Sequence, residues 1–313
     1  EQADRLRGTR FLEFHSRFKG LKPLSLLPHT TNEVKKAPDL LKEILHSDIL
    51  MSEIEIPEFS LIPVSNTFTY EVEGKSNPLF TPLLIEDTDE KIIHFINKGG
   101  IAVNVIYIST NEIKPVCLRI VSECLENGIT IWNIISDGYS SARMAIFARG
   151  GWWQKLWIYF SLNTGQTSLE VYTLSLLYNK AFIDIQTDVI HRAPETTSNQ
   201  LIKSIIKENG KGTFSGKIVV DRNACGTNAY QLNKNLMLDK SPEAYFHSRP
   251  FLEIGVDEVR CTHGSATSSL NQEEVFYLQS RGLPPAIITK ILTEAFAEDV
   301  LCYFPEEWQN KLK

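Results

Sequence analysis

Apolar positions follow a helical spacing near both ends of this chain and a strand-like spacing between them. Phe11, Phe14 and Phe18 recur at roughly helical intervals, and Gly20 ends this run. From about residue 54 the pattern changes to short runs rich in β-branched and aromatic residues. From Ser269 the helical period returns. The pattern therefore predicts a helical region, then a β region, then a second helical region.

The central region is a succession of predicted strands separated by Gly, Asn, Asp and Ser. The predicted strands are 101–108, 129–135, 153–160, 168–177, 181–190, 214–220 and 251–259. Repeated short strands with few helical patterns between them indicate a large all-β body. A sandwich, a barrel and a β-solenoid all fit this spacing. Because there is no strict short repeat, the pattern alone leaves the three architectures open.

The C-terminal region carries the signals of two helices. A capping box at the start of the first helix can be formed by Asn271 with Glu274 or by Ser269 with Gln272. Gly282 is placed to end that helix, and Pro284 and Pro285 to open the next. The second helix then shows an apolar face over about three turns. The residues of this face are Ile287, Ile288, Ile291, Leu292, Ala295 and Phe296.

Composition and charge exclude several classes of partner. A chain of 313 residues with 42% hydrophobic and 22% charged residues is ordinary for a globular protein with a sizeable core. The net charge of -6 argues against nucleic acid or an anionic membrane, because phosphate binding needs a basic face. The chain has no apolar run of about 18 residues. We therefore expect neither a nucleic-acid partner nor a membrane-spanning segment.

The five cysteines are odd in number, scattered, and form no CxxC pair. A disulfide framework is therefore not expected, and the sequence predicts a reducing, cytoplasmic compartment. A structural zinc site is also disfavoured, because paired ligand spacing is lacking.

Cys261 and His263 are the residues with the most reactive chemistry. In an extended backbone, positions i and i+2 face the same side, so the thiol and the imidazole would project together. Either side chain can bind a soft or borderline metal, and a protonated histidine nearby would lower the pKa of the thiol. The alternative is that Cys261 is a small buried hydrophobe and His263 a polar residue near a turn.

Two other motifs give little support for an enzyme. Gly210-Lys-Gly-Thr213 lacks the spacing of a phosphate loop, so a turn before a strand is favoured. The aromatic residues from Trp152 to Phe160 suit the stacking of sugar rings, as in a carbohydrate-active β-solenoid enzyme. Alternating aromatics in a strand more often belong to the core or to a partner surface.

Blocks of sequence between His191 and Leu301 resemble the SufB/SufD family of iron–sulfur cluster assembly proteins. The blocks are His191-Arg-Ala-Pro, Ser198-Asn-Gln-Leu201, Phe214-Ser-Gly-Lys-Ile-Val-Val220, Pro250-Phe-Leu-Glu-Ile254, Cys261-Thr-His-Gly264 and Phe276-Tyr-Leu-Gln-Ser-Arg-Gly282, followed by a closing helix with Ala295-Phe296. They occur in the order of the family and cover about a third of the chain. Upstream of His191 the chain is similar to the family only in layout.

Within the family the chain is most similar to SufD. SufB-type sequences carry His-Glu-Ala where this chain has His263-Gly264-Ser265, and they carry a functional Cys upstream that is lacking from Leu236 to His247. The glutamate of SufB is thought to help hold the nascent cluster. Compared with the family pattern, Ser265 resembles an insertion of one residue between Gly264 and Ala266. Such an insertion would shift the start of the following helix by one position.

The resemblance implies a mainly β fold, with a right-handed parallel β-helix core flanked by N-terminal and C-terminal helical regions. We place these regions at 1–55, 56–264 and 265–313. The resemblance also implies a non-catalytic scaffold that pairs with a SufB-type subunit as a heterodimer through the end of the core. A SufC-type ABC ATPase would dock on the C-terminal helices, for which the candidate residues are Phe276, Tyr277, Arg281 and Gly282.

For the site itself, the resemblance implies that His263 lies at the SufB–SufD interface and contributes to cluster assembly, with a transient metal contact, and that Cys261 is a second candidate. No stably bound cofactor is expected on this chain alone; a transient iron–sulfur cluster is expected in the complex. Two alternative functions stay open: a SufB-like scaffold that holds the cluster itself, and a carbohydrate-active β-solenoid enzyme.

Overall fold

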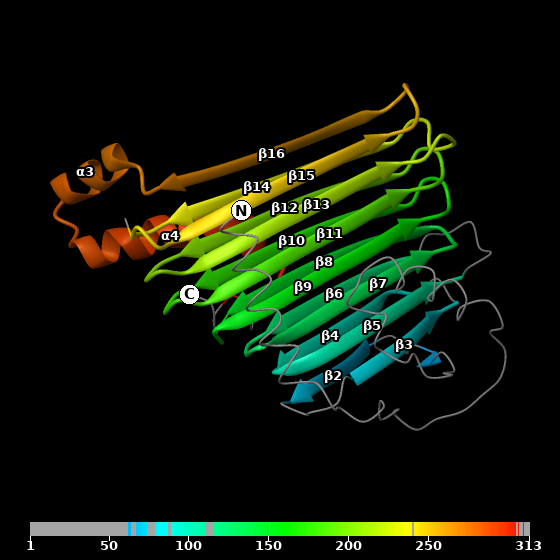
Figure 1. The fold of residues 1–313 in the computed structure, drawn as a ribbon, viewed down its shortest axis with the longest axis horizontal. Helices are drawn as coiled ribbons and strands as arrows, with labels where there is room; N and C mark the ends of the chain where they lie inside the picture. The colour runs from blue at the N-terminus through cyan, green and yellow to red at the C-terminus, as the bar shows by residue number, and fades with distance from the viewer. Residues whose placement is uncertain are drawn as a thin grey trace.

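The computed structural model describes residues 62–63, 67–73, 79–86, 89–109, 116–149, 151–239, 241–304, 306 and 309. Within these ranges the chain forms two sheets of eight strands, followed by helices α3 and α4 (Figure 1). One sheet contains β1 (Ile62–Pro63), β3 (Leu79–Ile85), β5 (Gly100–Ile108), β7 (Gly128–Ser136), β9 (Trp153–Leu162), β11 (Phe182–His191), β13 (Lys211–Val220) and β15 (Tyr245–Ile254). The other contains β2 (Thr67–Glu73), β4 (Lys91–Lys98), β6 (Val116–Cys124), β8 (Ser140–Arg149), β10 (Ser168–Leu177), β12 (Thr197–Ile206), β14 (Asn228–Met237) and β16 (Arg260–Ser269). The predicted helical region 1–55 lies outside the described residues.

The chain alternates between the two sheets from one strand to the next. Each strand pairs in parallel with the strand two places earlier, so every turn adds one strand to each sheet. This arrangement is a parallel β-solenoid, in which a turn contacts mainly its neighbours. It confirms the mainly β fold and removes the sandwich and the barrel, which the strand spacing had left open.

The interior of the first turns is mainly apolar, with a few buried polar residues such as Asn104. Alternation along each strand points every second side chain inward, and burial follows that period of two in β4. Phe95 and Trp132 are fully buried and meet edge to face, with 5.5 Å between ring centroids. Removal of this apolar surface from water is the main force that stacks one turn on the next.

The interior becomes polar in the last turns. Gln200, Gln231, Asn233 and Asn235 face inward and are almost completely buried. The amides bond to one another, for example Asn235 Nδ2 to Asn233 Oδ1 at 2.8 Å. Because the inward positions are not apolar, β12 and β14 lack the alternation that marks a half-buried strand. For that reason the apolar pattern did not predict these two strands.

The predicted strand 251–259 is displaced in the structure, where β15 ends at Ile254. Val256 and Val259 lie in the following turn and pack against a small apolar cluster. Their apolar character therefore reflects burial beneath a turn and not strand alternation. The last strand, β16, runs to Ser269 and continues the β body beyond residue 264.

Glu208 and Asn209 form a left-handed turn immediately before β13, with φ of 56° and 64°. Lys211 begins the strand. This confirms the interpretation of Gly210–Thr213 as a turn before a strand.

Both C-terminal helices start, and the first one ends, where the sequence predicts. Asn271 caps α3 (Gln272–Ser280), since its Oδ1 accepts a hydrogen bond from the backbone N–H of Glu273 at 3.0 Å. Gly282 follows with φ of 85°, a value that favours glycine. Pro285 occupies the first position of α4 (Pro285–Leu301).

Helix α4 packs on the outer face of the even-numbered sheet, over β10 and β12. The rings of Tyr172 and Tyr303 stack at 3.6 Å between centroids, and Phe147 meets Phe304 edge to face. Of the predicted apolar face, Ile288 is buried, whereas Ile287 and Ile291 are 44% and 40% exposed. The predicted face is therefore only partly used, because the contacts with the sheet come mainly from the C-terminal half of the helix.

Candidate functional site

Cys261 and His263 lie on β16, the last strand of the even-numbered sheet and one edge of the open end of the solenoid (Figure 1). Cys261 pairs with Ala229 and His263 with Gln231, both inward-facing residues of β14. Both side chains therefore belong to the row that continues the interior of the solenoid, as the i, i+2 spacing predicts.

Cys261 has the environment of a structural thiol. It is partly buried and packs against the apolar cluster that contains Ile218, Val220 and Ala229. Burial raises the pKa of the thiol, and a backbone hydrogen bond to Ala229 offsets this only in part. The raised pKa favours the neutral thiol over the thiolate that attacks electrophiles and binds metals.

His263 is exposed at the end of the solenoid. Within the described ranges no group of three or more His, Cys, Asp or Glu side chains is arranged to hold a metal ion. A metal contact of His263 would therefore have to be completed by ligands from outside this part of the chain. It remains a prediction.

Ser265 does not interrupt the last strand. Residues 260–269 pair with 228–237 in one unbroken register, and Ser265 lies opposite Asn233. The strand therefore has no bulge at Ser265, and His263 lies opposite Gln231.

The open end of the solenoid exposes two edge strands. β15 and β16 stand last in their sheets, so each has one pairing neighbour among the described strands. Phe251 and Ile254 of β15 are 54% and 46% exposed. An edge with free backbone groups and exposed apolar side chains is suited to pairing with another chain.

The four residues predicted to contact an ATPase lie together at α3, which contains no buried residue. Phe276 and Tyr277 are 72% and 56% exposed, and the guanidinium of Arg281 lies 5.3 Å from the centre of the Tyr277 ring. Gly282 ends the helix. Since α3 follows the end of β16, this group is separated from His263 by about 20 Å of strand.

The contact that holds α4 to the sheet was missed from the sequence. Lys203 of β12 has a side chain only 4% exposed, forms an ion pair with Asp299, and donates a hydrogen bond to the carbonyl of Phe296 at 2.6 Å. Burial lowers the pKa of Lys203, and Asp299 partly restores it. In the sequence, the only indication of this contact was the position of Lys203 within the largely apolar stretch 201–206.

His191 is a buried corner residue. Its Nδ1 lies 2.8 Å from the Thr196 hydroxyl and its Nε2 lies 2.9 Å from the Ser198 hydroxyl, which accounts for both ring nitrogens. Burial lowers the pKa of His191 to about 4. The His-Arg-Ala-Pro block therefore includes a neutral histidine that fixes a corner between two strands.

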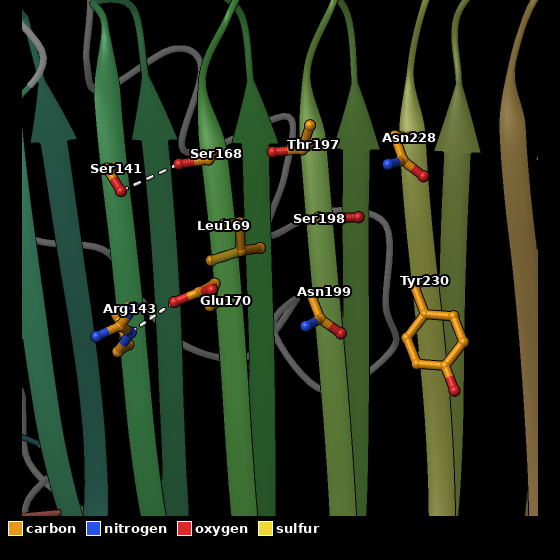
Figure 2. Close-up of a pocket in the computed structure, with 10 residues that line it drawn as sticks. All are labelled: Ser141, Arg143, Ser168, Leu169, Glu170, Thr197, Ser198, Asn199, Asn228 and Tyr230. Carbon is orange, nitrogen blue, oxygen red and sulfur yellow. Dashed lines mark hydrogen bonds and ion pairs between the residues drawn. The ribbon is translucent and has the colours of Figure 1, made fainter. Parts of the chain in front are cut away.

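A shallow polar groove of about 360 Å³ lies on the outer face of the even-numbered sheet. Figure 2 shows its side chains across β8, β10, β12 and β14, with Leu169 and Ser198 between two rows of mostly polar residues. Its single carboxylate, Glu170, is paired with Arg143 at 2.5 Å. Because glycoside hydrolysis usually needs two carboxylates, this groove gives no support to a carbohydrate-active enzyme.

The aromatic residues that suited sugar stacking belong largely to the packed body. Trp153 and Trp157 are 3% and 6% exposed, and Trp157 donates a hydrogen bond to Asp188 at 2.6 Å. This confirms the interpretation of these aromatics as packing residues. Among the described helices, none is long and apolar enough to cross a bilayer.

The chain matches a known protein family over the region that contains this site. Residues 134–296, just over half of the chain, match the family model described as SUF system FeS cluster assembly, SufBD core domain. The matched range begins within β7 and ends in α4. It includes the last strand with Cys261 and His263, and all of α3.

Three curated relatives show the same similarity. A SufBD family protein of Synechocystis is 39% identical over 139 residues, the chloroplastic protein ABCI7 of Arabidopsis thaliana is 34% identical over 140, and the iron–sulfur cluster assembly protein SufD of Escherichia coli is 31% identical over 139. The matched segment is 44% of this chain and 30%, 29% and 32% of these relatives, respectively. The chain thus matches less than a third of the length of each.

Proposed function

Because the chain belongs to the SufBD family of iron–sulfur cluster assembly proteins, we propose that it is a SufD-type, non-catalytic scaffold subunit of a complex with a SufB-type subunit and a SufC-type ABC ATPase. The single observation that carries the proposal is a pair of exposed surfaces at one end of the described β body. These are the edge strands β15 and β16 and the helix α3, which has no buried residue.

The edge strands provide the surface for the SufB-type subunit. Two solenoids that meet end to end would satisfy the free backbone groups of both edges, and Phe251 and Ile254 would be covered. His263 would then lie between the subunits, where ligands from both chains can reach a nascent cluster. The cluster is the cargo of the complex and is bound transiently.

Helix α3 provides the surface for the ATPase. Phe276, Tyr277 and Arg281 offer exposed aromatic area with a guanidinium beside it, a combination that is enriched at the centres of protein interfaces. α3 connects to β16 on one side and to the anchored α4 on the other. Motion of a bound ATPase would therefore be transmitted to the strand that carries His263.

Co-purification tests this proposal. The chain is expected to form a stable complex with the SufB-type subunit and the SufC-type ATPase encoded with it, measured by size-exclusion chromatography with light scattering. A chain that remains alone at micromolar concentrations of both partners contradicts the proposal.

Two substitutions separate the surfaces. Phe251→Glu places a charge on an edge strand and is expected to abolish SufB binding while ATPase binding persists. Phe276→Glu on α3 is expected to do the reverse. Tyr178→Glu is the matched control, because Tyr178 is 39% exposed in the turn between β10 and β11 and touches neither surface.

The SufB-like role is the second candidate, and the shared inward face of Cys261 and His263 is the observation in its favour. The raised pKa of the Cys261 thiol weighs against it. Anaerobic reconstitution of the isolated chain decides between the two roles. A SufD-type chain is expected to retain no stable cluster by visible absorption, whereas a cluster that survives gel filtration supports the SufB-like role.

The proposed compartment is cytoplasmic. All five cysteines are free, which suits a reducing environment. Expression with a fluorescent tag in the native host checks this assignment.

A further inference from the structure

A ladder of buried amides leads through the interior of the solenoid to His263. Gln200 on β12, Gln231 on β14 and His263 on β16 occupy paired positions on three successive strands. Neighbouring strands lie about 4.8 Å apart, so side chains at paired positions are in reach of one another. Gln200 and Gln231 are fully buried, whereas His263 is exposed at the open end.

The amide of Gln231 is held in a defined orientation. Its Nε2 donates a hydrogen bond to Gln200 Oε1 at 3.3 Å and lies 3.5 Å from the Thr187 hydroxyl. Gly216 of the opposite sheet faces the amide so closely that a Cβ there would lie 2.3 Å from Nε2. The same Cβ would lie 2.6 Å from Oε1, so the whole amide is confined beside Gly216 in the interior.

The acceptor end of Gln231 is unused. Its Oε1 is buried and has no hydrogen-bond partner among the described residues. An acceptor left unpaired in the interior costs about 1–3 kcal/mol, so a hydrogen bond from a donor within reach would stabilise the chain. The next paired position of the ladder after Gln231 is His263.

We propose that Gln231 is a positioning residue for His263, accepting a hydrogen bond on Oε1 from one ring N–H. This bond fixes the tautomer of the neutral imidazole and leaves the lone pair of the other ring nitrogen directed out of the open end. Metal-binding histidines are commonly oriented by such a partner. The structure holds the two residues at paired positions without this hydrogen bond, so the exposed imidazole has to turn towards Oε1 to form it. The inference rests on the proposed function only for the role of His263 in cluster assembly; the hydrogen bond is expected in the isolated chain.

The tautomer of His263 is the direct test. In the full chain labelled with ¹⁵N-histidine, long-range ¹H–¹⁵N NMR spectra at pH 8 are expected to show one dominant tautomer for His263, assigned by its loss in His263→Gln. The near-isosteric Gln231→Met, which removes the acceptor, is expected to give a mixture. Ser204→Ala is the control, because Ser204 is buried on the inner face of β12, away from the His263 position. It is expected to leave the tautomer unchanged.

Two outcomes overturn the inference. One is an unmutated chain whose His263 has the tautomer ratio of free histidine, a measurement that does not depend on the folding of any variant. The other is a folded Gln231→Met whose His263 tautomer is unaltered. Neither bears on complex formation with the SufB-type subunit and the ATPase, so failure here and failure of the proposed function are distinguishable.

Cluster assembly in cells gives the functional readout. Gln231→Met is expected to lower assembly about tenfold, the usual effect of losing a residue that orients a ligand. The double variant with His263→Ala should be no worse than His263→Ala alone. Full assembly by Gln231→Met contradicts the positioning role.

Discussion

The ammonium group of Lys203 on β12 and the carboxylate of Asp299 on α4 form an ion pair across 96 residues of sequence. The two ends of the pair differ in exposure, since the Lys203 side chain is 4% exposed and that of Asp299 is 54% exposed. Removal of either partner therefore has unequal consequences, because only the lysine would be left without water.

We expect Asp299→Ala to lower the free energy of unfolding by about 2 kcal/mol, and Lys203→Met to lower it by less. Urea unfolding followed by circular dichroism measures both. The exposed Lys290–Glu294 pair of α4 is the control, for which Glu294→Ala should change stability by about 0.5 kcal/mol or less. Equal losses for the two partners of the buried pair would contradict the reasoning.

Tyr303→Ala is expected to loosen the C-terminal end of α4. The substitution removes the stack on Tyr172 and the contact with Arg143, whose guanidinium lies 5.1 Å from the Tyr303 ring. Hydrogen exchange of the amides near residue 300 should become faster while exchange in β10 stays slow. Tyr303→Phe keeps the ring and should behave almost like the unmodified chain. Fast exchange in both variants would mean that the hydroxyl, and not the stack, holds the helix.

His191 makes stability dependent on pH. Its folded-state pKa of about 4 lies below the value of about 6.5 in an unfolded chain, so the unfolded state binds more protons between these limits. The stabilisation is complete above about pH 6.5 and is lost as the pH falls towards 4, by about 3 kcal/mol in total.

Urea unfolding between pH 4 and pH 7 tests this prediction against His191→Gln, which retains polar atoms but does not titrate. The variant should be less stable at pH 7 and should show a flatter dependence on pH. An unchanged slope in the variant would assign the acid sensitivity to other groups.

Gly216→Ala is expected to destabilise the solenoid by about 2 kcal/mol, because the added methyl group would overlap the buried Gln231 amide. Gly264→Ala is the matched control. Its Cβ would approach only Leu232 Cδ1, at 3.1 Å, and that flexible side chain can move. Thermal unfolding of the two variants measures the difference. A neutral Gly216→Ala would show that the Gln231 amide is not confined.

The sequence predicted some strands at their observed bounds and missed others, and interior polarity explains only part of this, because β4, β6 and β8 were missed although their inward residues are largely apolar. Strands with apolar inward residues, such as β10, were predicted at their observed bounds, Ser168–Leu177. β12 and β14 were missed because their inward positions hold Gln200, Gln231 and Asn233, which form hydrogen bonds instead of apolar contacts. The periodicity of apolar residues marks strands that bury apolar side chains, and it does not mark a strand whose buried side chains are hydrogen-bonded amides.

By itself the sequence determined the short-range features of this protein. Strand alternation placed Cys261 and His263 on one face, and Asn271, Gly282 and Pro285 marked the ends of the helices, because each of these effects acts within a few residues. The resemblance carried by the sequence blocks supplied the solenoid. Only the tertiary structure decided which residues meet between turns and across the sheet. The pairing of Gln231 with His263 and the burial of Cys261 arise from the stacking of turns about 30 residues apart, and the contact of Lys203 with Asp299 joins residues 96 apart. No local periodicity records that separation.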